Sequence, residues 1–366
     1  MKLFTAGPVA CRPEVLDAMK GLRLGNSVDK RRQMFSHRSE EYKELHKDTV
    51  ERFKDFLETD GNIFLYPSTG TGIMEGSIRS CIHDKVLITT NGAFGDRYVE
   101  VAESNGKDVV KFEKDMGKPI LPSELDDELT RNPDVEAVTV TYNETSTGLL
   151  NPLPELAKVV DEHDKLLFVD AVSAMGGAEI KADEWGIDIV FGSTQKAFGV
   201  PPGMAIGAVS DRALEKSEQV KNRGWYLDLL NYDSYYKRKS GTPSTSPIPI
   251  VLSMNKMLKI IEEEGGKKER LDLFKRRRNK IKKGIESIGL SLFPQKGYES
   301  PTISCVNAPE GMTGKEVYEE MRDYDIEIAA GYGDIKDKTF RIGNMGYVTM
   351  EEIDEMLKAL NEVVNK

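Results

Sequence analysis

One lysine, Lys196, lies among small, apolar and turn-forming residues in the stretch GSTQKAFGVPPG, residues 192–203. Most of the 51 lysines and arginines of the chain lie among other charges, and those side chains are expected on solvated surfaces. A lysine without charged neighbours lies either on a surface loop or in a pocket, and buried lysines are rare unless they are paired or used. A partly desolvated amine has an accessible neutral form, which is the form that attacks a carbonyl carbon.

A carboxylate, Asp170, ends the apolar run LLFVD. A carboxylate at the end of a buried strand is unfavourable unless a cation accompanies it. Asp170 can also cap the turn that follows, which would be a structural role only. We favour the functional interpretation, in which Asp170 faces a bound cationic group.

Two further turns carry groups that a ligand could use. YPSTGTGIME, residues 66–75, presents Thr69, Gly70 and Thr71 just before a helical stretch. Backbone N–H groups at a helix N-terminus form an anion site, although simple helix capping explains the same residues equally well. In TTNGAFGDRY, Phe94 follows another strand, where a ligand ring could stack on it; by itself it would more often be a core residue.

The elements that must position these groups follow from the hydrophobic pattern. Between residues 60 and 210, runs of Val, Ile and Leu alternate with amphipathic stretches, which predicts βαβ units and a mostly parallel sheet. The predicted strands are 62–66, 85–90, 108–112, 135–142, 165–171, 187–193 and 204–210. In such sheets ligands bind at the carboxyl ends of the strands, and all four groups follow predicted strands.

The pattern changes after residue 247. A long helical region leads to a smaller α+β unit, in which PTISCVNA and KTFRIGN are predicted strands. The Pro/Ser/Thr-rich stretch SGTPSTSPIP indicates a boundary between the two units. We therefore expect an N-terminal segment (1–20), a large domain (21–246) and a small C-terminal domain (247–366).

One cofactor requires an amine, a carboxylate, an anion site and a stacking ring together. Pyridoxal phosphate needs an amine that reacts with its aldehyde and a carboxylate that keeps its pyridine nitrogen protonated. It also needs an anion site for its phosphate. The positive ring nitrogen would account for a buried charge at Asp170.

The overall composition excludes several other classes. A net charge of −10 and a pI near 5.2 argue against a nucleic-acid partner, and the basic run at 267–284 is expected to be the solvated face of an amphipathic helix. No apolar stretch is long enough to span a bilayer, so no membrane partner is expected. The three scattered cysteines lack metal-ligand spacing, so we expect no metal, and they fit the reducing cytoplasm.

Taken together, these motifs resemble those of the class V aminotransferases of fold type I, in particular the alanine–glyoxylate and serine–pyruvate (or serine–glyoxylate) branch. The segments that carry the resemblance are TAGPVACRPEVLDAM, MFSHRSEEY, NGAFGDR, NETSTGLLNPL, VDAVSAMGG, GSTQKAFGVPPG, GTPSTSP and FRIGNMG. They span nearly the whole chain. The resemblance implies an α/β fold with a mostly parallel seven-stranded sheet between helices in the large domain, followed by a smaller α+β domain.

The resemblance also implies roles for individual residues. Lys196 corresponds to the lysine that binds pyridoxal phosphate covalently and moves protons, and Asp170 to the partner of the pyridine nitrogen. Arg341 corresponds to the arginine that binds the substrate α-carboxylate, and Thr245 to a phosphate ligand supplied across a homodimer interface. The remaining cofactor-binding positions are Thr69, Gly70, Thr71, Phe94, Thr145, Val172 and Gln195.

The activity implied is transamination of alanine or serine with glyoxylate or pyruvate, by a homodimer with composite active sites. Aspartate, glutamate, phosphoserine or aminoethylphosphonate remain alternative substrates. Arg38 in SHRSEEY would favour a dicarboxylate if it pointed into the pocket, but we expect it on the surface, paired with Glu40 or Glu41.

Three other functions fit the sequence less well. A class V desulfurase would need a nucleophilic cysteine on a mobile loop, whereas Cys305 lies in a predicted strand. A nicotinamide-dependent oxidoreductase could use the glycines at 70–76 but would leave Lys196 and Asp170 unexplained. A binding protein without catalysis is disfavoured by the intact set of Lys196, Asp170 and Arg341.

Overall fold

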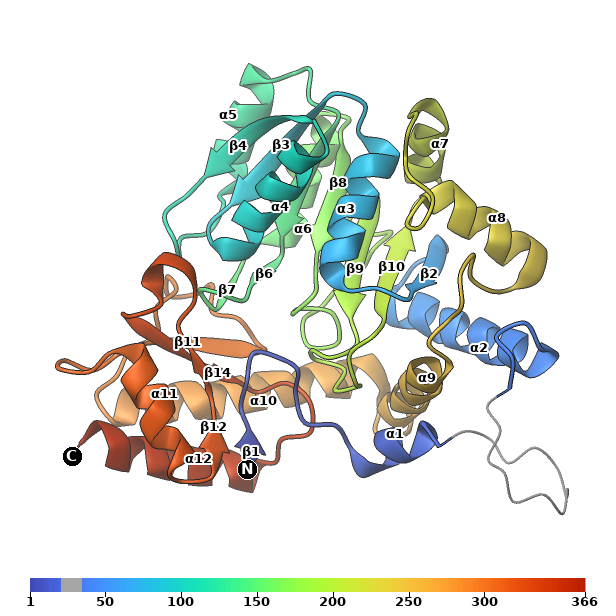
Figure 1. The fold of residues 1–366 in the computed structure, drawn as a ribbon. Helices are drawn as coiled ribbons and strands as arrows, with labels where there is room; N and C mark the ends of the chain where they lie inside the picture. Colours follow the sequence, from blue (N-terminus) through green and yellow to red (C-terminus); the bar gives the residue numbers. More distant parts are fainter. Residues whose placement is uncertain (21–34, 366) are drawn as a thin grey trace, which may run out of the picture.

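A seven-stranded sheet forms the centre of the protein (Figure 1). The structure is a computed structural model and describes residues 1–20 and 35–365. In spatial order the strands are β2 (Asn62–Tyr66), β10 (Ala205–Val209), β9 (Ile189–Ser193), β8 (Leu166–Asp170), β5 (Ala137–Thr141), β3 (Lys85–Thr90) and β4 (Asp108–Glu113). Within this sheet, β10 alone runs antiparallel to its neighbours. The prediction of a mostly parallel seven-stranded sheet is confirmed.

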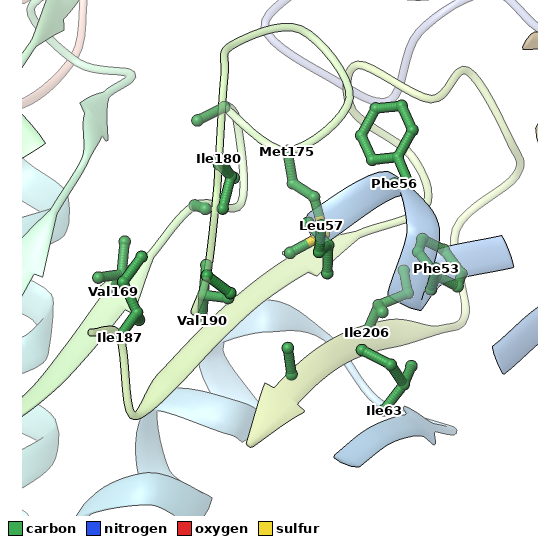
Figure 2. Close-up of a cluster of buried hydrophobic side chains, with 14 of the residues drawn as sticks. Phe53, Phe56, Leu57, Ile63, Val169, Met175, Ile180, Ile187, Val190 and Ile206 are labelled. Atoms are coloured by element: carbon green, nitrogen blue, oxygen red, sulfur yellow. The ribbon is translucent and has the colours of Figure 1, made fainter. Parts of the chain in front are cut away.

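Helices cover both faces of the sheet, because its strands are apolar on both sides. In β2, Ile63 and Leu65 pack into one buried cluster while Phe64 and Tyr66 pack into the other, as the period of two in a strand requires. The first cluster includes side chains of α2 (Glu40–Leu57), α5 (Pro122–Arg131), α6 (Leu153–Glu162) and α9 (Ile248–Glu263). The second includes side chains of α3 (Gly70–Cys81), α4 (Ala93–Ser104), α7 (Asp211–Gln219) and α8 (Leu229–Lys239). Figure 2 shows part of the first cluster, with side chains of α2 beside Ile206 of β10, and Val190 of β9 and Val169 of β8 farther along the sheet.

The carboxyl ends of the parallel strands face the C-terminal unit. The chain after β5 forms the short hairpin β6 (Asn143–Glu144) and β7 (Leu149–Leu150), which lies beside that unit in Figure 1. Backbone hydrogen bonds join the two parts here, from Leu150 N–H to the Tyr298 carbonyl and from Ser300 N–H to the Gly148 carbonyl. The loop after β5, which carries the predicted site residue Thr145, therefore lies between the two units.

The C-terminal unit is built on an antiparallel sheet of β11 (Ile303–Asn307), β14 (Thr339–Gly343) and β13 (Ala329–Ala330). Its helices are α10 (Gly266–Ser287), α11 (Gly314–Arg322) and α12 (Met350–Val364). The N-terminal strand β1 (Lys2–Leu3) pairs in parallel with β12 (Ile326–Glu327), and the short helix α1 (Pro13–Ala18) follows it. The first residues of the chain are thus attached to the C-terminal unit.

The long helical region predicted after residue 247 is two helices, α9 and α10. Gly265 and Gly266 separate them with φ angles of 108° and 78°, a left-handed conformation that ends a helix and that glycine adopts readily. Helix α9 packs with the large sheet, and residue 21 lies outside the described residues, so the domain boundaries at 20/21 and 246/247 stay predictions. None of the described helices is both long and apolar enough to cross a membrane.

Candidate active site

Lys196 lies in the loop after β9, half-buried. Its Nζ donates a hydrogen bond of 2.7 Å to the carbonyl oxygen of Ala6. Burial lowers the pKa of Lys196 to about 8, and the guanidinium groups of Arg341 and Arg97 act in the same direction, while the charge of Asp170 opposes them. Near pH 8 about half of the population is therefore the neutral, nucleophilic amine.

The backbone of the N-terminal segment lies directly against Lys196. Gly7 has a φ of 108°, and a Cβ built on it would lie 2.7 Å from Cδ and 3.1 Å from Nζ of the lysine. A side chain larger than hydrogen at this position would therefore displace the lysine side chain.

Asp170 ends the neighbouring strand β8 and is 3% exposed. Its Oδ1 accepts a hydrogen bond of 2.8 Å from the backbone N–H of Val172. Burial raises the pKa of this carboxyl group to about 7, and the charges of Lys196 and Arg97 lower it only in part. No ion pair joins Asp170 to a cation among the described residues, so the carboxylate fits a cationic partner that is not part of the chain.

The N-terminus of α3 offers the predicted anion site. Thr69 is the N-cap residue and its side chain makes no capping hydrogen bond; both Thr69 and Thr71 are exposed. The backbone N–H of Gly70 donates to Ser193 Oγ at 3.0 Å. A Cβ on Gly70 would lie 2.2 Å from Cγ2 of Val172, so only glycine allows the helix to start this close to the loop after β8.

Phe94 is positioned by Glu144, a residue of the segment NETSTGLLNPL for which the sequence predicts no individual role. The buried carboxylate of Glu144 accepts hydrogen bonds from the backbone N–H groups of Phe94 at 3.0 Å and Gly95 at 3.2 Å, in the first turn of α4. A carboxylate at a helix N-terminus is favourable, and here it fixes the turn that carries the Phe94 ring. Burial raises the pKa of Glu144.

Arg341 reaches the same region from the C-terminal unit. It lies on β14, is 7% exposed, and donates from Nε to the Ala330 carbonyl at 3.0 Å and from Nη1 to the Thr145 carbonyl at 3.3 Å. Thr145 in turn donates from Oγ1 to Ser173 Oγ at 2.7 Å. Arg341 forms no ion pair with a carboxylate in the described part of the chain, so its positive charge remains available to a substrate carboxylate.

The comparison with known proteins identifies the family. The chain matches the family described as aminotransferase class-V over residues 1–356. It belongs to the class V aminotransferases.

Named relatives of this class V aminotransferase act on amino acids and glyoxylate. It is 31% identical to L-aspartate–glyoxylate aminotransferase of Paracoccus denitrificans, over 86% of this chain and 81% of the relative. It is 30% identical to serine–glyoxylate aminotransferase of Methylorubrum extorquens, over 94% of this chain and 86% of the relative. The crystal structure of an alanine–glyoxylate aminotransferase from Nostoc sp. superposes with a TM-score of 0.91, at 29% identity, over 99% of this chain and 94% of that one.

Other predicted site residues of this aminotransferase lie at the margin of the cluster or outside it. Gln195 is half-buried next to Lys196, and Val172 is half-buried against Gly70. Thr245 is exposed in the loop between α8 and α9, and no described contact joins it to Lys196.

Arg38 and Cys305, on which the alternative functions depend, also have clear positions. Arg38 is exposed, and it lines a cavity of about 280 Å³ rather than the Lys196 cluster. The cavity is lined by His37, Arg38, Lys43, Arg238, Lys239, Gly241 and Thr242. Cys305 is fully buried in β11, and burial raises the pKa of its thiol to about 12, so it lacks the properties of a desulfurase nucleophile.

The prediction for the basic run at 267–284 is wrong for two of its arginines. Arg270 and Arg277, on α10, are 5% and 4% exposed. Arg270 donates to the carbonyls of Gly176 at 3.2 Å and Ala197 at 2.5 Å, in the loops that follow Asp170 and Lys196. Both arginines donate hydrogen bonds to backbone carbonyl groups in loops. The composition of the sequence does not show which arginines turn inward in this way.

Arg277 makes the corresponding contacts in the C-terminal unit. Its Nη1 donates to the carbonyls of Asn344 at 3.1 Å and Gly346 at 3.2 Å, and its Nη2 donates to the carbonyl of Val348. These residues form the loop that follows Arg341 on β14. Through these hydrogen bonds, helix α10 binds the loops that follow Asp170, Lys196 and Arg341.

Proposed function

We propose that this class V aminotransferase transfers the amino group of alanine or serine to glyoxylate or pyruvate, with pyridoxal phosphate bound at Lys196. The observation that carries the proposal is the pair formed by Lys196, a half-buried amine, and Asp170, a buried carboxylate that forms no ion pair within the described residues. The two side chains follow adjacent strands, β9 and β8. The named relatives, which act with glyoxylate, support the acceptor.

The residues present fit pyridoxal phosphate. Thr69, Gly70 and Thr71 would hold its phosphate at the α3 N-terminus, and Asp170 would hold its pyridine nitrogen. Phe94 and Val172 would lie against the two faces of its ring. When bound, the cofactor supplies an aldehyde for Lys196 and a ring that takes up the electron pair released at the substrate α-carbon.

The chain itself provides substrate orientation and proton transfer. Arg341 would bind the substrate α-carboxylate through the paired N–H groups of its guanidinium, which brings the α-carbon toward the loop of Lys196. The neutral amine of Lys196 would then take the α-proton on Nζ and deliver it to the opposite end of the reacting system. Because Asp170 is buried, its charge acts on the ring nitrogen without competition from water.

The choice of donor rests on Arg38, the arginine that would favour a dicarboxylate if it pointed into the pocket. Arg38 is exposed in a separate cavity, which favours a neutral side chain such as that of alanine or serine. Aspartate is the second candidate, because a relative at 31% identity is an L-aspartate–glyoxylate aminotransferase.

A half-reaction experiment separates these donors. The purified protein, loaded with pyridoxal phosphate, is mixed with alanine, serine, aspartate, glutamate or aminoethylphosphonate, and the loss of the visible band of the bound cofactor is followed. We expect alanine or serine to react fastest. A preference for aspartate or glutamate would replace the donor assignment, and no reaction with any donor would refute the proposed function.

The proposal includes a cytoplasmic homodimer with composite active sites. Thr245 is exposed three residues after Thr242, which lines a cavity together with the cations Arg38, Lys43, Arg238 and Lys239, a setting that suits a phosphate held by a second copy of the chain. Closed two-fold symmetry is also the commonest form of assembly. Three free cysteines support the reducing cytoplasm.

A further inference from the structure

Tyr332 lies between the residue assigned to the cofactor and the residue assigned to the substrate carboxylate. Its ring stacks on Phe94 with 5.8 Å between ring centroids and an interplanar angle of 11°. Cζ of Arg341 lies 5.3 Å from the centroid of the same ring. Tyr332 thus contacts both α4 of the large sheet and β14 of the C-terminal unit.

The loop that carries Tyr332 is closely packed against its surroundings. A Cβ on Gly331 would lie 2.4 Å from the carbonyl oxygen of Lys336, so the backbone allows no side chain there. Gly333 has a φ of 61°, and a Cβ on it would lie 3.6 Å from Cβ of Ala93, the first residue of α4. The glycines on both sides therefore place Tyr332 against the first turn of α4.

The hydroxyl group of Tyr332 fixes the orientation of its ring. It accepts a hydrogen bond of 2.9 Å from Nη2 of Arg97, whose Cζ lies 4.8 Å from the centroid of the Phe94 ring. Arg97 forms no ion pair with a carboxylate in the described part of the chain. The ring is thus held by Phe94 at its face and by Arg97 at its hydroxyl, although 37% of the side chain is exposed.

A substrate bound to Arg341 has to share this space. With hydrogen bonds of about 2.8 Å between guanidinium and carboxylate, the substrate α-carbon lies about 5 to 6 Å from Cζ of the arginine. This is close to the distance at which the Tyr332 ring already lies from the same atom. The Tyr332 ring therefore takes up part of the space around the guanidinium that a bound substrate enters.

We propose that Tyr332 is a specificity-determining residue that restricts the amino donor to a small side chain, an inference that rests on the proposed function. Alanine or serine fits beside the ring. A longer unbranched side chain has to displace the ring from Phe94 and break its hydrogen bond with Arg97. The selectivity of the site therefore depends on the bulk of the ring, and the hydroxyl group contributes by holding the ring in place.

The first test compares donors of increasing length: alanine, 2-aminobutyrate, norvaline and norleucine. The ratio of kcat/KM for alanine to that for norvaline is measured in the wild type, Tyr332→Leu and Tyr332→Phe. Because one methylene is worth about tenfold or more in a shape-selective pocket, we expect the ratio to fall at least about tenfold in Tyr332→Leu. It should change less than about threefold in Tyr332→Phe, which keeps the ring.

Tyr318→Leu is the matched control, because Tyr318 lies on α11 and its ring contacts Arg322 rather than the site. An unchanged ratio in Tyr332→Leu, with alanine still converted, would overturn the proposal. An equal fall in Tyr318→Leu would overturn it as well. If Tyr332→Leu does not fold, as judged by thermal unfolding, Tyr332→Met is measured in its place.

The second test does not depend on turnover. The affinities of acetate, propionate, butyrate and valerate for the protein loaded with pyridoxal phosphate are measured by titration calorimetry. In the wild type we expect affinity to fall along the series, and in Tyr332→Leu this fall should disappear. If the affinity falls along the series to the same extent in both proteins, the proposal is overturned. If the wild type converts no donor, the proposed function fails, whereas the carboxylate series still tests whether Tyr332 limits the space next to Arg341.

Discussion

Nζ of Lys196 donates a hydrogen bond to the carbonyl oxygen of Ala6, which lies 190 residues earlier in the chain. The carbonyl favours the ammonium form, but burial has the larger effect, because the pKa of Lys196 is lowered to about 8. The N-terminal segment is therefore part of the candidate active site. The packing of Gly7, in this segment, against Lys196 can be tested by substitution.

Gly7→Ala is expected to displace Lys196 and to weaken cofactor binding. The new Cβ would lie 2.7 Å from Cδ of the lysine, in addition to the backbone strain of a φ of 108°. Gly106→Ala is the control, because Gly106 has a φ of 71° but open space around it, so it tests the strain alone. Strain of this kind is about 1–2 kcal/mol. Retention of pyridoxal phosphate after gel filtration is measured, and equal retention in both variants would contradict the prediction.

Borohydride reduction of the loaded protein should label Lys196. Reduction makes the bond between the lysine and the cofactor permanent, and mass spectrometry of the peptides then locates the label. We expect the peptide that contains GSTQKAFGVPPG to carry it. A label on another lysine would refute the assignment.

In the cofactor-free protein, Lys196 should react with an amine reagent with a midpoint near pH 8. Its pKa of about 8 lies below the ordinary value of 10.5, so ionised Lys196 destabilises the fold at low pH. This destabilisation is lost as the pH rises from about 8 to 10.5. Arg341→Gln should move the midpoint upward and Asp170→Asn should move it downward, because their charges act in opposite directions. A midpoint near 10.5 would contradict the burial of the amine.

Asp170→Asn should retain pyridoxal phosphate but lose turnover by about 100-fold or more, as expected when one preorganised charge is removed. The neutral amide still fits the space but does not keep the ring nitrogen protonated. Asp188→Asn is the control, because Asp188 is also 3% exposed but accepts hydrogen bonds from Leu167 N–H and Ser210 at the opposite ends of the strands. Turnover near the wild-type rate in Asp170→Asn would rule out its proposed role.

Mixing Lys196→Ala with Thr245→Asp should restore up to about a quarter of the wild-type activity. In a composite homodimer, half of the dimers are mixed, and one site in each mixed dimer has both intact residues. Lys196→Ala mixed with Asp170→Asn is the control, because both residues belong to the same side of the site and no rescue is expected. Failure of the first mixture, with mixed dimers demonstrated, would argue against shared sites.

The sequence predicted those parts of the molecule that depend on local pattern. The strands predicted at 62–66 and 85–90 have these same bounds in the structure, because apolar runs between turns identify buried strands. Lys196 and Asp170 were found because each follows such a strand. Their roles, and those of the other site residues, stay predictions.

The residues that the sequence did not reveal act through partners that are distant along the chain. Glu144 binds Phe94 from 50 residues away, and Arg270 binds Ala197 from 73 residues away. Composition shows that a segment is basic or polar, but it does not show which side chain turns inward. The same holds for Tyr332, whose neighbours Phe94 and Arg341 come from helix α4 and from strand β14 of the C-terminal unit.

The arginines of α10 have a mechanical consequence. Arg270 is bound to the loops after Asp170 and Lys196, and Arg277 is bound to the loop after Arg341. Seven residues of straight helix, about 10 Å of axial rise, separate the two anchors. Helix α10 thus connects the loop of the Lys196 amine to the loop of the Arg341 guanidinium over a fixed length of helix. While these hydrogen bonds hold, we expect the loops that follow Lys196 and Arg341 to keep their spacing.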